Sequence, residues 1–119
     1  MAHLLRPDEL PVGFSYPREF LRIVELGLLD LEPWRVLHGN LLRSRCTGLR
    51  RRYPERTLIP FAIRQDNDDV ACWEVGSPGV RVVHDFADPG WEDRASFPSF
   101  YAWLRAAIDD LIEFDGGEA

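Results

Sequence analysis

The chain has 119 residues, 45% of them hydrophobic and 29% charged, which is the composition of one soluble globular domain spanning residues 1–119. Its net charge of -6 argues against binding of nucleic acid or of an anionic membrane by the surface as a whole. No apolar run approaches the ~20 residues of a membrane span, and the amino terminus lacks a signal-peptide pattern, so we expect a cytoplasmic protein.

The first part of the chain predicts an irregular arm followed by a helix. Residues 1–14 are interrupted by proline and glycine and show no periodicity. Ser15-Tyr16-Pro17 is a helix-start pattern, because proline is tolerated in the first helical turn. Apolar residues then recur at helical spacing, namely Phe20, Ile23 and Val24. Gly27 suits a C-terminal cap of this helix.

A short strand at Arg35–His38 and a second helix at Leu41–Tyr53 come next. One apolar stripe runs along this helix, and it consists of Leu42, Cys46, Leu49 and Tyr53. Arginines occupy the other faces of the helix (Arg43, Arg45, Arg50, Arg51 and Arg52). Gly48 within the helix costs about 1 kcal/mol relative to alanine. Pro54 ends the helix.

The central segment predicts three strands. Thr57–Arg64, Val70–Val75 and Val80–Phe86 are rich in β-branched and bulky apolar residues. The polar break Gln65–Asp68 and the break Gly76–Gly79 separate them. Because parallel pairing needs a long crossover, these short connections predict an antiparallel meander.

The last part predicts a loop at Ala87–Ala95, which carries Trp91, and a long helix that begins at a capping Ser96. The apolar seam of this helix consists of Phe100, Leu104, Ala107, Leu111 and Phe114, and Trp103 and Ile108 widen it. The acids Asp109, Asp110 and Glu113 are predicted to lie on the outer side of the helix. The predicted fold is therefore α+β: a small, mostly antiparallel sheet, made of the three-strand meander plus an edge strand, covered by two N-terminal helices and one long C-terminal helix.

The acidic segment Asp66–Asp69 raises the question of a calcium site. An EF-hand loop needs glycine at its sixth position and a bidentate acid at its twelfth, whereas Ala71 and Ser77 occupy these positions. A turn whose side chains bond backbone amides explains the same residues. We expect no metal and no cofactor.

The search for catalytic residues also gives a negative prediction. His84 and Asp85 are neighbours on a strand, so their side chains should point to opposite faces. Cys72 would act as a nucleophile only beside an imidazole, and the sequence places none there. We expect Cys46 and Cys72 to be buried thiols in a reducing cytosol. The chain is predicted not to be an enzyme.

Charge is polarised along the sequence, basic before Arg64 and acidic after it. The arginines of the second helix, with Arg56, could contact phosphate or an acidic protein face, or they could form a solvated helix face. Polarised charge suits a protein that docks onto a partner with complementary charge.

Several short motifs resemble the SUKH superfamily, which contains bacterial toxin-immunity proteins and a fungal regulator of cell-wall assembly. The motifs are spread over most of the chain, although the segment 28–56 matches poorly (Leu10-Pro11, Phe20-Leu21, Ile59-Pro60-Phe61-Ala62, Asp66-Asn67-Asp68-Asp69, Val70-Ala71-Cys72-Trp73-Glu74, Val83-His84-Asp85 and Ser96-Phe97). The resemblance implies a protein that neutralises a cognate toxin, often a nuclease, by direct contact. A regulatory or scaffold domain and a small enzyme are the alternatives.

The predicted contact surface follows from the charge of such a partner. A nuclease presents a positive surface that binds the phosphates of its substrate. Acidic residues near an aromatic anchor residue would compete with those phosphates for the same surface. The candidate residues are five acids and one tryptophan (Asp66, Asp68, Asp69, Trp91, Glu92 and Asp93). The alternative is that Trp91 packs into the core and the acids only solubilise the chain.

Overall fold

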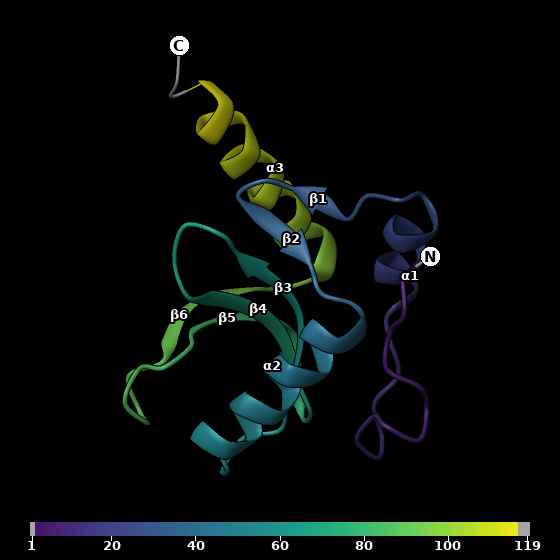
Figure 1. The fold of residues 1–119 in the computed structure, drawn as a ribbon, viewed down its shortest axis with the longest axis vertical. Coiled ribbons are helices and arrows are strands. Elements are labelled where there is room, and N and C mark those ends of the chain that lie inside the picture. The colour runs from purple at the N-terminus through teal and green to yellow at the C-terminus, as the bar shows by residue number, and fades with distance from the viewer. Residues whose placement is uncertain (1, 117–119) are drawn as a thin grey trace.

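The computed structural model describes residues 2–116 and shows an α+β fold with a six-stranded antiparallel sheet and three helices (Figure 1). The strands lie side by side in sequence order: β1 (Asp30–Leu31), β2 (Trp34–Val36), β3 (Leu58–Arg64), β4 (Asp69–Glu74), β5 (Ser77–His84) and β6 (Asp93–Phe97). The helices are α1 (Arg18–Glu25), α2 (Gly39–Arg52) and α3 (Phe100–Gly116). Within residues 2–116, no helix is both long and apolar enough to cross a membrane.

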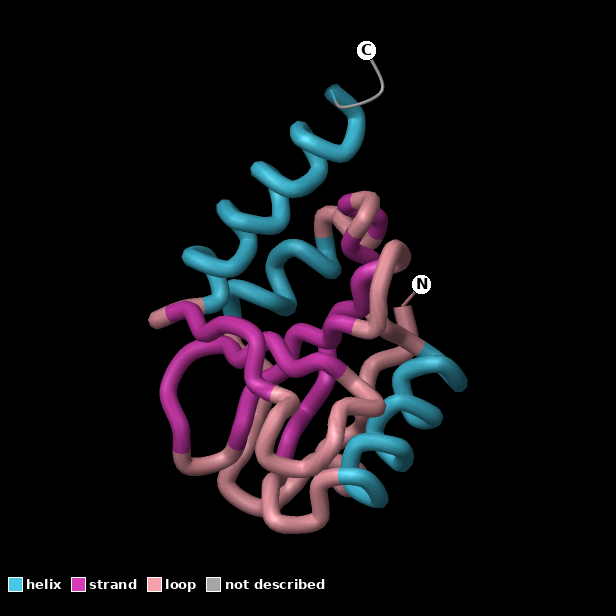
Figure 2. Tube along the Cα trace, turned by 90° about the vertical axis from the view of Figure 1, so that its left-hand side faces the viewer, coloured by secondary structure: helices cyan, strands magenta, loops and turns pink. Residues whose placement is uncertain are grey.

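The two faces of the sheet carry different cores, because alternate strand residues point to opposite sides. On one face, α1 and α3 enclose an aromatic cluster in which Phe61 stacks on Trp73 with ring centroids 4.3 Å apart and Phe20 meets Trp73 edge-on at 5.1 Å. On the other face, Leu49 and Tyr53 from the end of α2 pack on the strands. Figure 2 shows the sheet between α3 and α2.

The central part of the predicted fold is confirmed. The segments β3, β4 and β5 form the predicted antiparallel meander, joined by short turns. Three helices occupy the predicted places, two before the meander and one after it. The predicted short strand Arg35–His38 overlaps β2 (Trp34–Val36), which begins one residue earlier and ends two residues earlier.

The sheet is larger than predicted, because the segment before α3 is a strand and not a loop. In β6, Ser96 pairs with Arg81 of β5, so it does not cap the last helix. Ser99 caps α3 instead, since its Oγ accepts a hydrogen bond from the Ala102 N–H at 3.1 Å. Most side chains of β6 are exposed, so the alternation that reveals a half-buried strand is missing from its sequence. The two-residue strand β1 is too short to show any alternation.

The facing of α3 also differs from the prediction. Its first half is buried through Phe100, Trp103 and Ala107, but Ile108 and Phe114, predicted to join the seam, are exposed. Asp110, predicted to point outward, accepts hydrogen bonds from Trp34 Nε1 at 2.9 Å and Arg64 Nη1 at 3.2 Å. Asp110 thus still lies over β2 and β3, whereas the last turns of α3 extend beyond the body of the molecule, which leaves Phe114 exposed (Figures 1 and 2).

Candidate protein-interaction surface

The two segments that carry the predicted contact residues lie together at one end of the sheet. The β3–β4 turn and the β5–β6 connection are adjacent, because the Asp85 N–H donates to the Asp68 carbonyl at 2.9 Å. The turn has the predicted form, with Asn67 Oδ1 accepting from the Asp69 N–H at 2.7 Å. In the described part of the chain, no three His, Cys, Asp or Glu side chains are grouped to hold a metal ion.

Most of the predicted acids are paired within the protein. Their partners come from neighbouring strands and from the segment after α2: Asp66 with Arg64, Asp69 with His84 and Arg94, and both Glu92 and Asp93 with Arg56. Among residues 2–116, Asp68 alone of the five has no side-chain partner. Internal pairing lowers the negative charge that these acids offer to a partner. The negative potential at this end of the sheet is therefore weaker than the number of acids in the sequence indicates.

The exposed feature at this end is the connection Asp85–Glu92, which we call the aromatic loop. Its two aromatic side chains, Phe86 and Trp91, are 60% and 82% exposed. Trp91 therefore does not pack into the core. Phe86 has a φ of 70°, in the left-handed region that a bulky side chain rarely occupies, at a cost of about 1–3 kcal/mol. Backbone strain of this kind persists only where the surrounding structure holds it.

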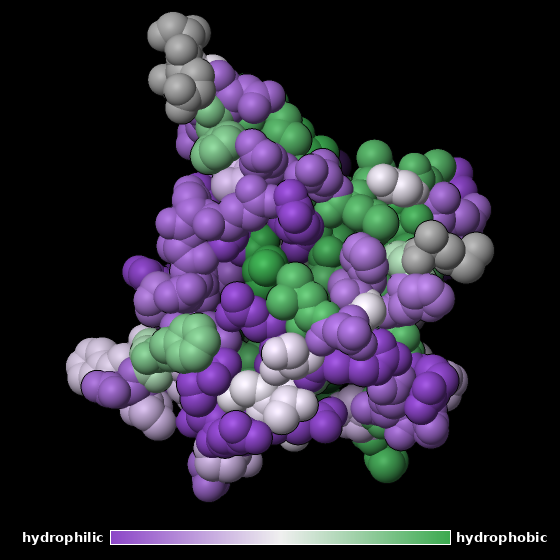
Figure 3. Space-filling view, in the orientation of Figure 1, coloured by the Kyte–Doolittle hydropathy of each residue, from purple (hydrophilic) through white to green (hydrophobic). Residues whose placement is uncertain are grey.

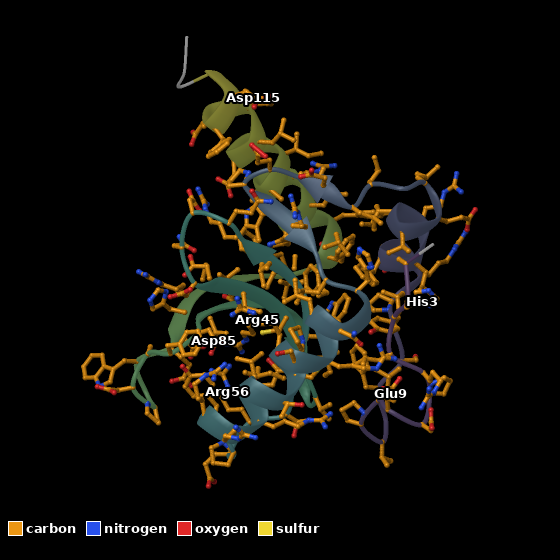
Figure 4. The ribbon with its side chains drawn as sticks, in the orientation of Figure 1. His3, Glu9, Arg45, Arg56, Asp85 and Asp115 are labelled. Atoms are coloured by element: carbon orange, nitrogen blue, oxygen red, sulfur yellow. The ribbon has the colours of Figure 1, made fainter. Side chains whose placement is uncertain are left out.

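The start of the aromatic loop is held by a buried ion pair that the sequence analysis missed. The Asp85 side chain is completely buried beneath α2. Arg52 donates two hydrogen bonds to the Asp85 carboxylate, from Nε to Oδ1 at 2.6 Å and from Nη2 to Oδ2 at 2.7 Å. Arg45 Nη1 donates a third hydrogen bond to Oδ2 at 3.1 Å. Asp85 and Arg45 lie close together between α2 and the strands (Figure 4). Bidentate guanidinium–carboxylate bonds fix orientation as well as distance.

The remainder of the aromatic loop is anchored by the segment that follows α2. The Tyr53 hydroxyl donates to the Ala87 carbonyl at 2.8 Å. Buried Glu92 accepts bonds from Arg56 Nη1 at 2.9 Å and from the Gly90 N–H at 2.7 Å. Burial acts to raise the pKa of Glu92, but these hydrogen bonds outweigh it and hold that pKa below its ordinary value. Four polar anchors thus hold a loop whose aromatic rings stay in solvent.

Gly48 explains how Arg52 reaches Asp85. Arg52 lies one turn after Gly48, and a helical side chain leans back over the preceding turn. A Cβ atom at Gly48 would lie only 2.5 Å from Arg52 Nη2. The glycine therefore leaves room for the guanidinium, which also lies 4.1 Å from the centre of the Phe86 ring in a cation–π contact.

We predict that Gly48→Ala destabilises the protein, although alanine is the better helix former by about 1 kcal/mol. The end of a flexible arginine normally moves aside easily, but here it is held by Asp85, so the added methyl group weakens a buried pair. Urea unfolding of Gly48→Ala and of Gly48→Ala in an Arg52→Ala background measures the coupling. The first variant should lose stability, and the second should gain relative to Arg52→Ala alone. A gain of similar size in both would contradict this role of Gly48.

The arginines of α2 have a structural use that the two sequence-based alternatives did not include. Arg45 and Arg52 hold Asp85, and Arg43 holds Glu9 of the N-terminal arm at 2.7 Å. The Arg43 guanidinium lowers the pKa of Glu9 to about 2. A hollow of about 630 Å³ beside Phe86 is lined by arginines without any carboxylate (Leu41, Arg43, Ser44, Arg45, Thr47, Gly48, Arg51, Arg52 and Phe86). Among the residues described, Arg51 makes no ion pair, so it is free to meet an anion.

The groups considered for catalysis lie apart. His84 and Asp85 point to opposite faces as predicted: His84 Nδ1 lies 3.0 Å from Asp69 on the next strand, while Asp85 faces α2. Cys72 and Cys46 are buried, and burial raises the pKa of both thiols. The Cys72 thiol donates to the Arg81 carbonyl at 3.4 Å. Protonated thiols of this kind are poor nucleophiles.

A comparison of the chain with protein-family models, with curated proteins and with solved structures found no match. The function is therefore argued from the residues and their geometry.

Proposed function

We propose that the protein is a non-enzymatic binding protein whose aromatic loop docks onto a protein partner. The observation that carries this proposal is the exposure of Phe86 and Trp91 on a loop fixed by buried ion pairs. Tryptophan is enriched among the residues that dominate binding energy. A loop that is already ordered loses little conformational entropy on binding, so more of the contact energy appears as affinity.

The partner that fits the resemblance to the SUKH superfamily is a cognate bacterial toxin, and a nuclease is the class that the surface suits. Asp68 at the neighbouring turn has no internal partner among residues 2–116, and Asp66 and Asp93 are also exposed although paired. These carboxylates would attract the basic surface that a nuclease uses for phosphates. The aromatic loop would then supply the short-range contact, in a cytoplasmic complex without cofactor or metal.

The test is binding between the purified protein and the toxin encoded by a neighbouring gene, measured by calorimetry and by survival of cells that express both. The proposal expects a stoichiometric complex and protected cells. Loss of protection with Trp91→Ala would place the contact on the aromatic loop. If the protein does not bind the toxin and instead remains bound to a larger endogenous complex, the result would favour the regulatory alternative and overturn the proposed toxin-binding function.

A further inference from the structure

The hollow beside Phe86, of about 630 Å³, has the composition of an anion-binding site. It lies along α2, where three small residues leave room between four arginines (Arg43, Arg45, Arg51 and Arg52). No carboxylate among residues 2–116 lines it, and the exposed acid Asp88, two residues after Phe86, is not part of its lining. Figure 3 shows the face of the molecule that carries α2, where the side chains around this helix are mostly hydrophilic.

More positive charge lines the hollow than the protein itself neutralises. Arg45 and Arg52 share one carboxylate, that of Asp85. A second arginine of the lining is balanced by Glu9 of the N-terminal arm, with an ion pair at 2.7 Å. Arg51 makes no ion pair with any residue from 2 to 116. Two carboxylates thus balance four guanidinium groups, and two positive charges remain in excess.

The paired arginines keep hydrogen-bond donors for a ligand. Arg45 commits a single N–H donor to Asp85, from Nη1, whereas Arg52 commits two, from Nε and Nη2. Arg52 Nη1 is not used in this way, and it lies over Gly48, because a Cβ atom on that glycine would be 3.1 Å from Nη1. Since Asp85 already fixes both guanidinium groups, they lose little conformational freedom when a ligand binds.

We propose that this hollow binds a nucleoside monophosphate, with the phosphate among the arginines and the base against Phe86. A phosphate monoester carries about two negative charges at neutral pH, which matches the excess in the hollow, whereas a carboxylate carries one. Arg51 supplies an unpaired guanidinium, which can bind phosphate with two parallel hydrogen bonds. The volume of the hollow is typical of small-molecule sites, so it accommodates a whole ligand and not only an inorganic ion.

Phe86 favours a ligand that carries a flat ring. The Arg52 guanidinium carbon lies 4.1 Å from the centre of the Phe86 ring, yet the side chain remains 60% exposed. Nucleic-acid bases stack readily on exposed aromatic rings of this kind. Inorganic phosphate or a sugar phosphate would satisfy the arginines but would leave this ring in solvent. The combination of arginines with a ring therefore selects a nucleotide.

This site does not depend on the proposed function, because nucleotide binding is measured on the purified protein alone. Trp91, which carries the proposed docking contact, does not line the hollow. Trp91→Ala should therefore weaken toxin binding and leave nucleotide binding unchanged, whereas Arg51→Ala should do the reverse. Either proposal can thus fail without the other.

The first test is an NMR titration of the intact chain with adenosine 5′-monophosphate in phosphate-free buffer. We expect the amide resonances of α2 and Phe86 to shift. We expect the nucleotide to bind at least about tenfold more tightly than adenosine, which lacks the phosphate, and than ribose 5-phosphate, which lacks the base. Inorganic phosphate that binds as tightly as the nucleotide would reduce the hollow to a simple anion site and overturn the proposal. No shifts, shifts only outside the hollow, or tighter binding of phosphotyrosine would also overturn it.

The second test compares two pairs of matched variants. Arg51→Ala should lower the affinity for the nucleotide and for ribose 5-phosphate at least about tenfold, because it removes a charged hydrogen-bond donor. Arg50→Ala is its control, since Arg50 is the adjacent exposed arginine but does not line the hollow. Phe86→Ala should lower only the affinity for the nucleotide, at least about fivefold, and Trp91→Ala is its control. The NMR spectra verify that each variant is folded. Equal effects of Arg51→Ala and Arg50→Ala would show nonspecific charge attraction and overturn the site.

Discussion

Asp85→Ala is expected to lower the free energy of unfolding by about 3–5 kcal/mol, the range for removing one partner of a buried ion pair. The Asp85 carboxylate is completely buried, and among residues 2–116 it is the only ion-pair partner of both Arg45 and Arg52. Without this carboxylate, the guanidinium groups of Arg45 and Arg52 on α2 have no counter-charge. The aromatic loop also loses its first anchor, because Asp85 Oδ1 accepts the Phe86 N–H at 2.9 Å.

Two controls separate this effect from a general sensitivity of the region. Arg51→Ala, in the same helix turn but without an ion pair, should change stability by less than about 0.5 kcal/mol. Asp85→Leu combined with Arg45→Met and Arg52→Met should recover most of the loss, because a buried pair replaced by apolar groups leaves no charge unpaired. Urea unfolding ranks the variants. Near-native stability of Asp85→Ala would show that water reaches and solvates both arginines.

The centre of the fold could be predicted because its signals are local. The strands β3, β4 and β5 show apolar and β-branched runs, and the polar Gln65–Asp68 break marks the turn between the first two. The edge strands could not be predicted in the same way. β6 is held by backbone bonds to β5 and buries little of its own surface, so its side chains carry no alternating pattern.

The candidate site was only partly predictable for a related reason. Trp91 and the acids of the two connections are visible in the sequence, and the meander brings them to one end of the sheet. Asp66 pairs locally with Arg64, but the pairs that hold the loop join residues 33 to 40 positions apart, as in Arg52–Asp85, Arg56–Glu92 and Arg45–Asp85. Nothing local specifies such pairs. The one available signal was a charged residue, Asp85, at the end of an apolar strand, since a buried acid requires a cationic partner.

Phe86 was missed because its sequence context predicts a strand. It follows Val82 and Val83 and continues their apolar pattern, so the pattern places it in the sheet. In the structure the chain leaves the sheet at His84, and the positive φ of Phe86 turns its ring out over Arg52. The aromatic loop is therefore defined by its anchors and not by its composition.

Trp91→Ala is expected to weaken binding of the partner toxin at least about 30-fold, which corresponds to about 2 kcal/mol, the threshold for a dominant interface residue. Because Trp91 is 82% exposed in the free protein, the same change should alter stability by less than about 0.5 kcal/mol. A large loss of affinity without loss of stability is the signature of a contact residue.

The kinetics of binding distinguish Trp91 from its charged neighbours. Loss of a buried aromatic contact should mainly speed dissociation, whereas Asp68→Asn should slow association and reduce its dependence on salt, because Asp68 acts at long range. Surface plasmon resonance at two salt concentrations measures both rates. Phe86→Ala tests whether the second ring shares the contact, and Val12→Ala is the control for loss of an exposed apolar side chain. Unchanged rates for Trp91→Ala and Phe86→Ala in folded protein would move the interface away from the aromatic loop, and the arginine-lined hollow along α2 would be the next surface to test.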